Sequence, residues 1–180
     1  MKGKQKPEFL STNEMRRRAP FHFFAKADNA FFVANFFSSC SSKTLEYKKQ
    51  ELGYGGASSI AVSETARREY AIALELIIKA NIALLIEHGL AEDNVVKVRT
   101  THDTAALWVE AKLPKIDTTL RKQLVFTREV LEWSGRYAAP ANDKSDIVIA
   151  DQLASLDPER YGPNKEMKIR KAEYFDEDLS

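Results

Sequence analysis

The residues of this chain that could take part in chemistry form three short groups. They are the pair Glu75 and Lys79, the dipeptide His102-Asp103 and the dipeptide Arg136-Tyr137. Glu75 and Lys79 stand at positions i and i+4, so on a helix their side chains share one face and can form an ion pair. In a buried helix each charge needs a partner, because losing one leaves the other uncompensated. The pair is interpreted either as a helix-fixing ion pair or as part of the lining of a ligand or RNA groove.

His102 and Asp103 stand where the sequence predicts the start of a helix. Free backbone N–H groups at a helix start, together with these side chains, can bind an anion. The alternative is capping, in which Thr100 is the N-cap residue and Asp103 lies in the first turn, where its charge favours the positive end of the helix dipole. Both interpretations make His102 and Asp103 candidate ligand-binding residues.

Arg136 and Tyr137 follow the last strongly periodic segment of the chain. A guanidinium can hold a phosphate in a fixed geometry, and a neighbouring tyrosine ring can stack on a base. The alternative is an arginine that packs at the end of the fold.

The segment Tyr70–His88 must position the first group, and it is apolar on most sides. A helix of this kind belongs at the centre of a bundle rather than at its surface. Gly89 follows as a helix stop. The chain contains few glycines and prolines, and they cluster between periodic segments, which favours helices. We therefore predict an all-α, up-and-down bundle of four to five helices. The predicted helices cover residues 20–39, 59 or 61 to 88, 100–114, 118–133 and, as a short fifth helix, 145–156.

The first predicted helix, residues 20–39, is rich in phenylalanine, and Pro20 suits its first turn. This density of aromatic residues predicts a strongly buried helix. Phenylalanines at helical spacing belong to a core or to an oligomer interface, with base stacking by an exposed stripe as the weaker alternative. The faces rich in Phe and Ala predict a homodimer.

Charge and composition divide the chain into three parts. Residues 1–18 are predicted to form a flexible basic arm, residues 19–140 the helical bundle, and residues 141–180 a short helix with a charged tail. Residues 41–59 are read as a connector. The net charge is +1, so the whole chain has no general attraction to nucleic acid or membrane.

The sequence predicts a cytoplasmic protein without a metal or other cofactor. The single cysteine, Cys40, fits a reducing compartment, and the three histidines lack the spacing of zinc ligands. No signal peptide is recognised, and no apolar run is long enough to predict a transmembrane helix.

Three motifs occur in an order that resembles a known family. They are ALELIIKANIALLIEHG (residues 73–89), THDTAALW (101–108) and WSGRYAAP (133–140). They resemble the Glu-x-x-x-Lys-Ala helix, the His-Asp-Leu helix start and the Arg-Tyr-Pro segment of HEPN domains, in the subgroup similar to the C-terminal helical domain of kanamycin nucleotidyltransferase. The resemblance covers about residues 60–140. It implies a helical bundle, often homodimeric, in a bacterial toxin–antitoxin, phage-defence or nucleotide-transfer system.

Many catalytic members of that family are metal-independent ribonucleases with an Arg-x(4–6)-His motif near the last core helix. In this chain Arg136 occupies the arginine position, but no histidine follows it. Arg17 and His22 have the spacing, but they lie before the first helix of the bundle. The resemblance therefore implies a non-catalytic or degenerate member that binds RNA, a nucleotide or a protein partner such as a nucleotidyltransferase.

Two alternatives to that function stay open. The first is a divergent metal-independent endoribonuclease that uses Arg136 with His102, or with His88 of a second subunit. The second is a structural protein–protein interaction module.

Overall fold

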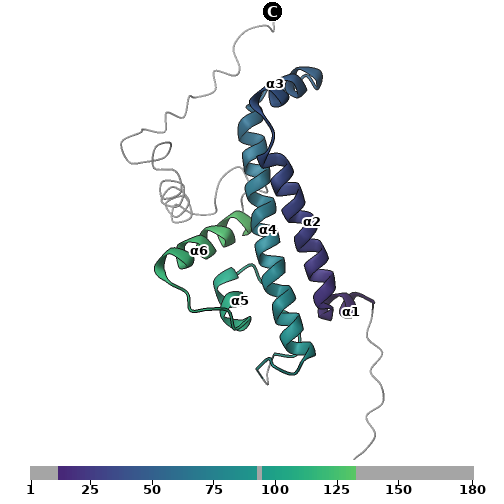
Figure 1. Cartoon of the computed structure of the whole chain (residues 1–180), viewed down its shortest axis with the longest axis vertical. Coiled ribbons are helices and arrows are strands. Elements are labelled where there is room, and N and C mark those ends of the chain that lie inside the picture. The colour runs from purple at the N-terminus through teal and green to yellow at the C-terminus, as the bar shows by residue number, and fades with distance from the viewer. Residues whose placement is uncertain (1–11, 93–94, 133–180) are drawn as a thin grey trace, which may run out of the picture. The chain divides into compact units, whose positions relative to one another are not determined.

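The computed structural model describes residues 12–92 and 95–132. Within these ranges the chain forms helices and no strands (Figure 1). The all-α prediction is confirmed. The helices are α1 (Thr12–Arg18), α2 (Pro20–Ser38), α3 (Ser42–Glu51), α4 (Ser58–Glu87), α5 (Thr104–Glu110) and α6 (Thr118–Glu132). The predicted short helix at 145–156 lies outside the described residues, as do Arg136 and Tyr137.

The long helix α4 is the centre of the described fold, as its apolar sequence predicted. Helix α2 runs antiparallel along one side of it, and α5 and α6 pack on the other side (Figure 1). Both α2 and α4 bury alanines, and small side chains let two helix axes approach closely. The buried alanines are Ala27, Ala30 and Ala34 in α2, and Ala66, Ala71, Ala73, Ala80 and Ala83 in α4.

The main core lies between α4 and α5. Ile78 and Ile82 of α4 pack there with Leu107 of α5, and Trp108 and Leu113 cover the cluster from its edge. Leu107 is fully buried. A second, smaller cluster joins α4 to the end of α6 through Ala71, Val130 and Leu131. These two clusters fix α5 and α6 against the inner face of α4.

Helix α3 occupies a stretch that was predicted to be a connector, so that prediction is wrong. Ser41 caps the helix, because its side-chain oxygen accepts a hydrogen bond from the backbone N–H of Thr44 at 3.2 Å. The helix buries none of its residues. It therefore lacks the apolar stripe on which a sequence-based helix prediction depends. Gly53 follows it with a φ of +61°.

Helix α5 is shorter than predicted. It begins at Thr104, and its N-cap residue is Asp103, whose carboxylate accepts a hydrogen bond from the N–H of Ala106 at 3.0 Å. The predicted capping role of Thr100 is wrong. The helix ends at Glu110, before Pro114, and Lys112 then adopts a φ of +53°.

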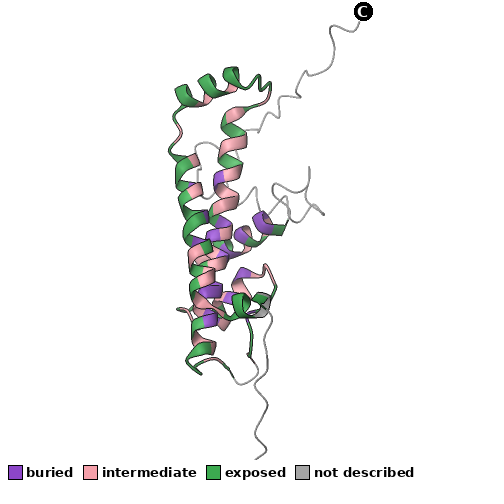
Figure 2. Cartoon of the chain, turned by 90° about the vertical axis from the view of Figure 1, so that its right-hand side faces the viewer, coloured by how far each residue is buried: buried purple, intermediate pink, exposed green. Residues whose placement is uncertain are grey.

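The phenylalanines of α2 are largely exposed, so the prediction of a strongly buried helix is wrong for the described chain. Phe21 is 78% exposed and Phe32 is 70% exposed. The reason is the number of neighbours: α2 packs extensively only on α4, and this contact buries one narrow side of the helix. Figure 2 shows the exposed outer surface of this helix pair.

Two further observations bear on the predicted organisation. Residues Thr12–Arg18, the last seven of the predicted basic arm, form the short helix α1. Among the described residues, no helix combines the length and apolar content that a membrane crossing requires.

Candidate functional site

A buried carboxylate joins three of the side chains that the sequence singled out. Lys79 Nζ donates to Glu75 Oε1 at 2.7 Å, and His102 Nδ1 lies 2.7 Å from Glu75 Oε2. The Glu75 and Lys79 side chains are only 8% and 9% exposed, whereas that of His102 is 42% exposed. Glu75 therefore has a partner on each of its oxygens, one from its own helix and one from the segment before α5. We refer to this cluster as the Glu75 network.

The Glu75 network fixes the orientation of the His102 ring. An ionised carboxylate only accepts hydrogen bonds, so Nδ1 must carry the proton in this contact. In the neutral ring the other nitrogen, Nε2, is then an acceptor, and it makes no hydrogen bond to a described residue. An imidazole held in this way has the tautomer that a general base requires. The arrangement is compatible with proton transfer at Nε2.

The segment before α5 is anchored on both sides of His102. Val98 is buried in the main core, and Arg99 Nε forms an ion pair with Glu110 Oε2 at 3.1 Å. The Thr101 hydroxyl accepts a hydrogen bond from the N–H of Asp103 at 3.1 Å. Asp103 itself does not join the Glu75 network, since its carboxylate caps α5. Asp103 is thus the N-cap residue of α5 itself and not a first-turn residue behind a Thr100 cap, while its ligand-binding role stays a prediction.

Helix α6 closes the region from the other side. The buried hydroxyl of Thr104 donates to the carbonyl of Leu124 at 2.6 Å. Arg128 Nε donates to Glu132 Oε1 at 2.8 Å. This hydrogen bond raises the pKa of Arg128 against the lowering effect of burial, and the charges of Glu132, Asp103 and Glu129 add to the rise. Arg128 therefore remains a cation that already has a partner.

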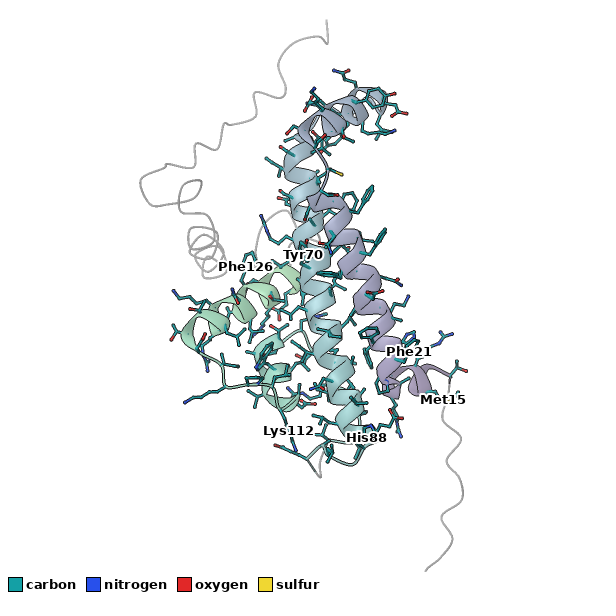
Figure 3. The ribbon with its side chains drawn as sticks, in the orientation of Figure 1. Met15, Phe21, Tyr70, His88, Lys112 and Phe126 are labelled. Atoms are coloured by element: carbon teal, nitrogen blue, oxygen red, sulfur yellow. The ribbon has the colours of Figure 1, made fainter. Side chains whose placement is uncertain are left out.

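The other predicted site residues are not part of this cluster. Arg136 and Tyr137 lie outside the described residues, so their roles stay predictions. His88 is exposed just after the end of α4 (Figure 3). In the part of the chain that the structure describes, no group of three or more His, Cys, Asp or Glu side chains could hold a metal ion.

An extended apolar face on α2 and α4 is a surface feature that the sequence did not locate. We define this aromatic face by Phe21, Phe24 and Phe31 of α2 and by Tyr70, Ile77 and Leu84 of α4. Two adjoining hollows, of about 1280 and 380 Å³, run along it and share Phe24, Leu74 and Ile77. Figure 3 labels Phe21 and Tyr70 toward opposite ends of the face.

Contacts between the two helices order the upper part of the aromatic face. The rings of Phe31 and Tyr70 meet edge to face with centroids 5.9 Å apart. The Tyr70 hydroxyl donates to Asn35 Oδ1 at 3.0 Å. The face is therefore a defined surface that α2 and α4 build together. The regular spacing of Tyr70, Ile77 and Leu84 at every seventh position was the available sequence signal.

The exposed area of the aromatic face approaches that of a protein interface. The fractional exposures of its six residues run from 37% for Tyr70 to 78% for Phe21. With about 200 Å² for a fully exposed large side chain, the face presents on the order of 600 Å². This is the upper end of apolar patches on typical monomers, and one side of a standard interface buries about 800 Å². Phe32 and Phe36 extend the surface further around α2.

Comparison of the whole chain with protein-family models, with curated proteins and with solved structures finds no match.

Proposed function

We propose that this chain is a non-catalytic, HEPN-like helical binding protein of a bacterial defence or toxin–antitoxin-type system, and that it works as a homodimer. The observation that carries the proposal is the aromatic face on α2 and α4. The HEPN assignment depends on the three sequence motifs and on the absence of a histidine after Arg136. A neighbouring nucleotidyltransferase is the protein partner that the resemblance implies.

The charges around the aromatic face favour a protein partner over RNA. A surface that stacks bases along a nucleic acid strand needs cations that follow the phosphates. Among the described residues, the charged side chains that line the two hollows are Arg18, Asp28 and Glu87, so acids outnumber cations in this part of the chain. None of the three has an ion-pair partner among the described residues. A phosphate backbone would meet repulsion on this face, while an apolar protein surface would not.

A second copy of the chain is the partner that this face fits best. In a two-fold dimer the same patch meets itself, so an apolar patch is automatically matched by an apolar patch. Arg18 of one protomer can then pair with Asp28 or Glu87 of its partner, which removes unpaired charges from the rim. The aromatic residues of the patch are the types that dominate interface energetics.

The test is the oligomeric state of the full-length chain by sedimentation velocity across a concentration series. We expect a dimer at micromolar concentration. Ile77→Asp places a charge in the middle of the face and should weaken dimerisation at least a hundredfold. Val109→Asp is the matched control, because Val109 is 67% exposed on α5, outside the aromatic face. A second disrupting variant, Phe21→Ser, changes a side chain too exposed to matter for folding.

A wild-type chain that stays monomeric at 100 micromolar, taken as roughly the upper limit for a useful dimer, would refute the proposal. So would an Ile77→Asp variant that is folded by circular dichroism and dimerises like the Val109→Asp control.

A second candidate function, a divergent metal-independent ribonuclease, is favoured by one observation: His102 Nδ1 lies 2.7 Å from Glu75 Oε2, a contact that leaves Nε2 as an acceptor when Nδ1 donates to the carboxylate. The leading proposal expects no cleavage of RNA at high protein concentration. Cleavage that disappears in both His102→Ala and Arg136→Ala, but persists in His22→Ala, would replace the leading proposal with this one.

A further inference from the structure

A third hollow, of about 620 Å³, lies where the end of α2, the start of α3, α4 and α6 meet. Its volume is within the range of about 300–1000 Å³ that is typical of small-molecule sites. Figure 3 labels Tyr70 and Phe126, which line the hollow from α4 and α6. Tyr70 and Leu74 also line the hollows of the aromatic face, whereas the lining residues from α3 and α6 belong to this hollow alone. Its walls are therefore largely distinct from the aromatic face.

Arg67 is the one charged side chain among the described residues that line this hollow. It is half-buried, and its guanidinium carbon lies 6.0 Å from the centre of the Phe126 ring, which orients it between α4 and α6. No described carboxylate forms an ion pair with it, whereas the guanidinium of its neighbour Arg68 lies 3.4 Å from the carboxylate of Glu69. Arg67 thus offers a positioned cation that the described part of the chain does not neutralise.

The charge of the hollow selects a monoanion, and a carboxylate in particular. One guanidinium carries a single positive charge, and no second cation is found among the described lining residues. A phosphate monoester carries a charge of about −1.5 to −2 at neutral pH, so Arg67 alone would leave part of that charge uncompensated. A carboxylate carries one charge, and its two oxygens match the planar fork of N–H donors on an arginine.

The other walls of the hollow favour a ligand with an apolar body. Thr127 and Ser63 each donate to a backbone carbonyl of their own helix, and the Tyr70 hydroxyl donates to Asn35. The three remaining serines of the walls are exposed residues, where water solvates their hydroxyls. A body with several hydroxyl or amide groups would therefore find few partners here. Apolar side chains make up most of the remaining wall, among them Phe37, Leu45, Val62, Ala66, Phe126 and Val130.

We propose that this hollow binds a small apolar monocarboxylate, such as an aryl-substituted alkanoic acid. Arg67 pairs with the carboxylate through its fork of N–H donors, and the apolar walls from α2, α3, α4 and α6 cover the body of the ligand. Two features act together in this assignment: a half-buried guanidinium without a carboxylate partner in the described chain, and walls that contain no described acid. The proposal adds a small-molecule site to the chain and does not rest on the dimer.

The experiment is isothermal titration calorimetry of the full chain with phenylbutyrate, which should bind with a dissociation constant below about 1 mM. Phenylbutyramide lacks the charge and butyrate lacks the ring, so each should bind at least tenfold more weakly. Phenyl phosphate, which keeps a ring but carries more charge, should also bind more weakly. Arg67→Met should weaken phenylbutyrate binding at least tenfold, and Arg67→Lys should fall between Arg67→Met and wild type. Arg68→Met is the matched control and should change the affinity less than twofold.

Amide chemical shifts of the wild-type chain give a test that needs no variant. The signals of Leu45, Arg67 and Thr127 should move when phenylbutyrate is added, and that of Val109 should not. The proposal is overturned if phenylbutyrate does not bind at millimolar concentration, if the shifts lie elsewhere, or if Arg67→Met and Arg68→Met weaken binding equally. Phenylbutyramide or phenyl phosphate that binds as tightly as phenylbutyrate would also overturn it.

Discussion

Removal of Lys79 should destabilise the fold far more than removal of an ordinary helix lysine. A surface pair at i and i+4 is worth a few tenths of a kcal/mol. The Glu75 and Lys79 side chains are both more than nine-tenths buried, so water cannot replace the missing ammonium in Lys79→Met. Breaking one half of a buried pair costs about 3–5 kcal/mol. His102 keeps its contact with the other Glu75 oxygen, which places the expectation at the lower end, about 3 kcal/mol.

Urea unfolding followed by circular dichroism measures this loss. For a slope of about 2 kcal/mol per molar urea, a loss of 3 kcal/mol lowers the midpoint by roughly 1.5 M. Lys48→Met is the matched control, because Lys48 pairs with Glu51 at the surface of α3, where both side chains are about half exposed. Lys48→Met should lower the free energy of unfolding by about 0.5 kcal/mol or less.

The double variant Glu75→Leu/Lys79→Met separates a buried pair from a packing effect. Replacing both charges with apolar groups removes the uncompensated carboxylate, so the double variant should be more stable than Lys79→Met alone. The reasoning fails if Lys79→Met costs less than about 1 kcal/mol. It also fails if adding Glu75→Leu makes the protein still less stable, because the uncompensated Glu75 carboxylate would then not be the cause of the loss in Lys79→Met.

Two further changes test local backbone features. Asp103→Ala removes the α5 cap and should lower stability by about 1 kcal/mol, which corresponds to a fall in melting temperature of about 2–4 °C. Asp103→Asn can still cap the helix and should keep most of the wild-type stability. Gly89 has a φ of +64° and open space around its Cα, so Gly89→Ala should cost about 1 kcal/mol through the backbone alone. Gly55→Ala, at a glycine without positive φ, is the control, and an equal loss in both variants by urea unfolding would contradict the second prediction.

The sequence predicted those elements whose apolar pattern reflects their surroundings. The apolar run Tyr70–His88 indicated a central helix, and α4 ends at Glu87, one residue from the predicted end. Ser41 is a typical N-cap residue, so the sequence also contained a signal for the start of α3. That signal alone does not predict a helix, because a solvent-exposed helix has no apolar periodicity to support the prediction.

The exposure of α2 could not be derived from its composition. A helix buried within its own protomer and a helix that is covered only by a second protomer can have the same density of phenylalanine. What decides is the number of neighbouring elements, and only α4 packs extensively on α2 within the described chain. The contact of His102 with Glu75, 27 residues apart, likewise depends on how the segment before α5 folds back onto α4. Periodicity carries no information on such a distance.

The two features of α4 that matter for function can be tested separately. Glu75 and Ile77 are two positions apart, so their side chains point about 200° apart around the helix. The Glu75 network faces α5, and Ile77 belongs to the aromatic face on the outside. A charge at Ile77 should therefore leave His102 and its carboxylate in place, because the side chains of Glu75 and Ile77 point to nearly opposite sides of α4. If RNA cleavage were observed and Ile77→Asp abolished it together with the dimer, the active site would have to combine residues from both protomers, because the contact of His102 within one protomer would still be intact.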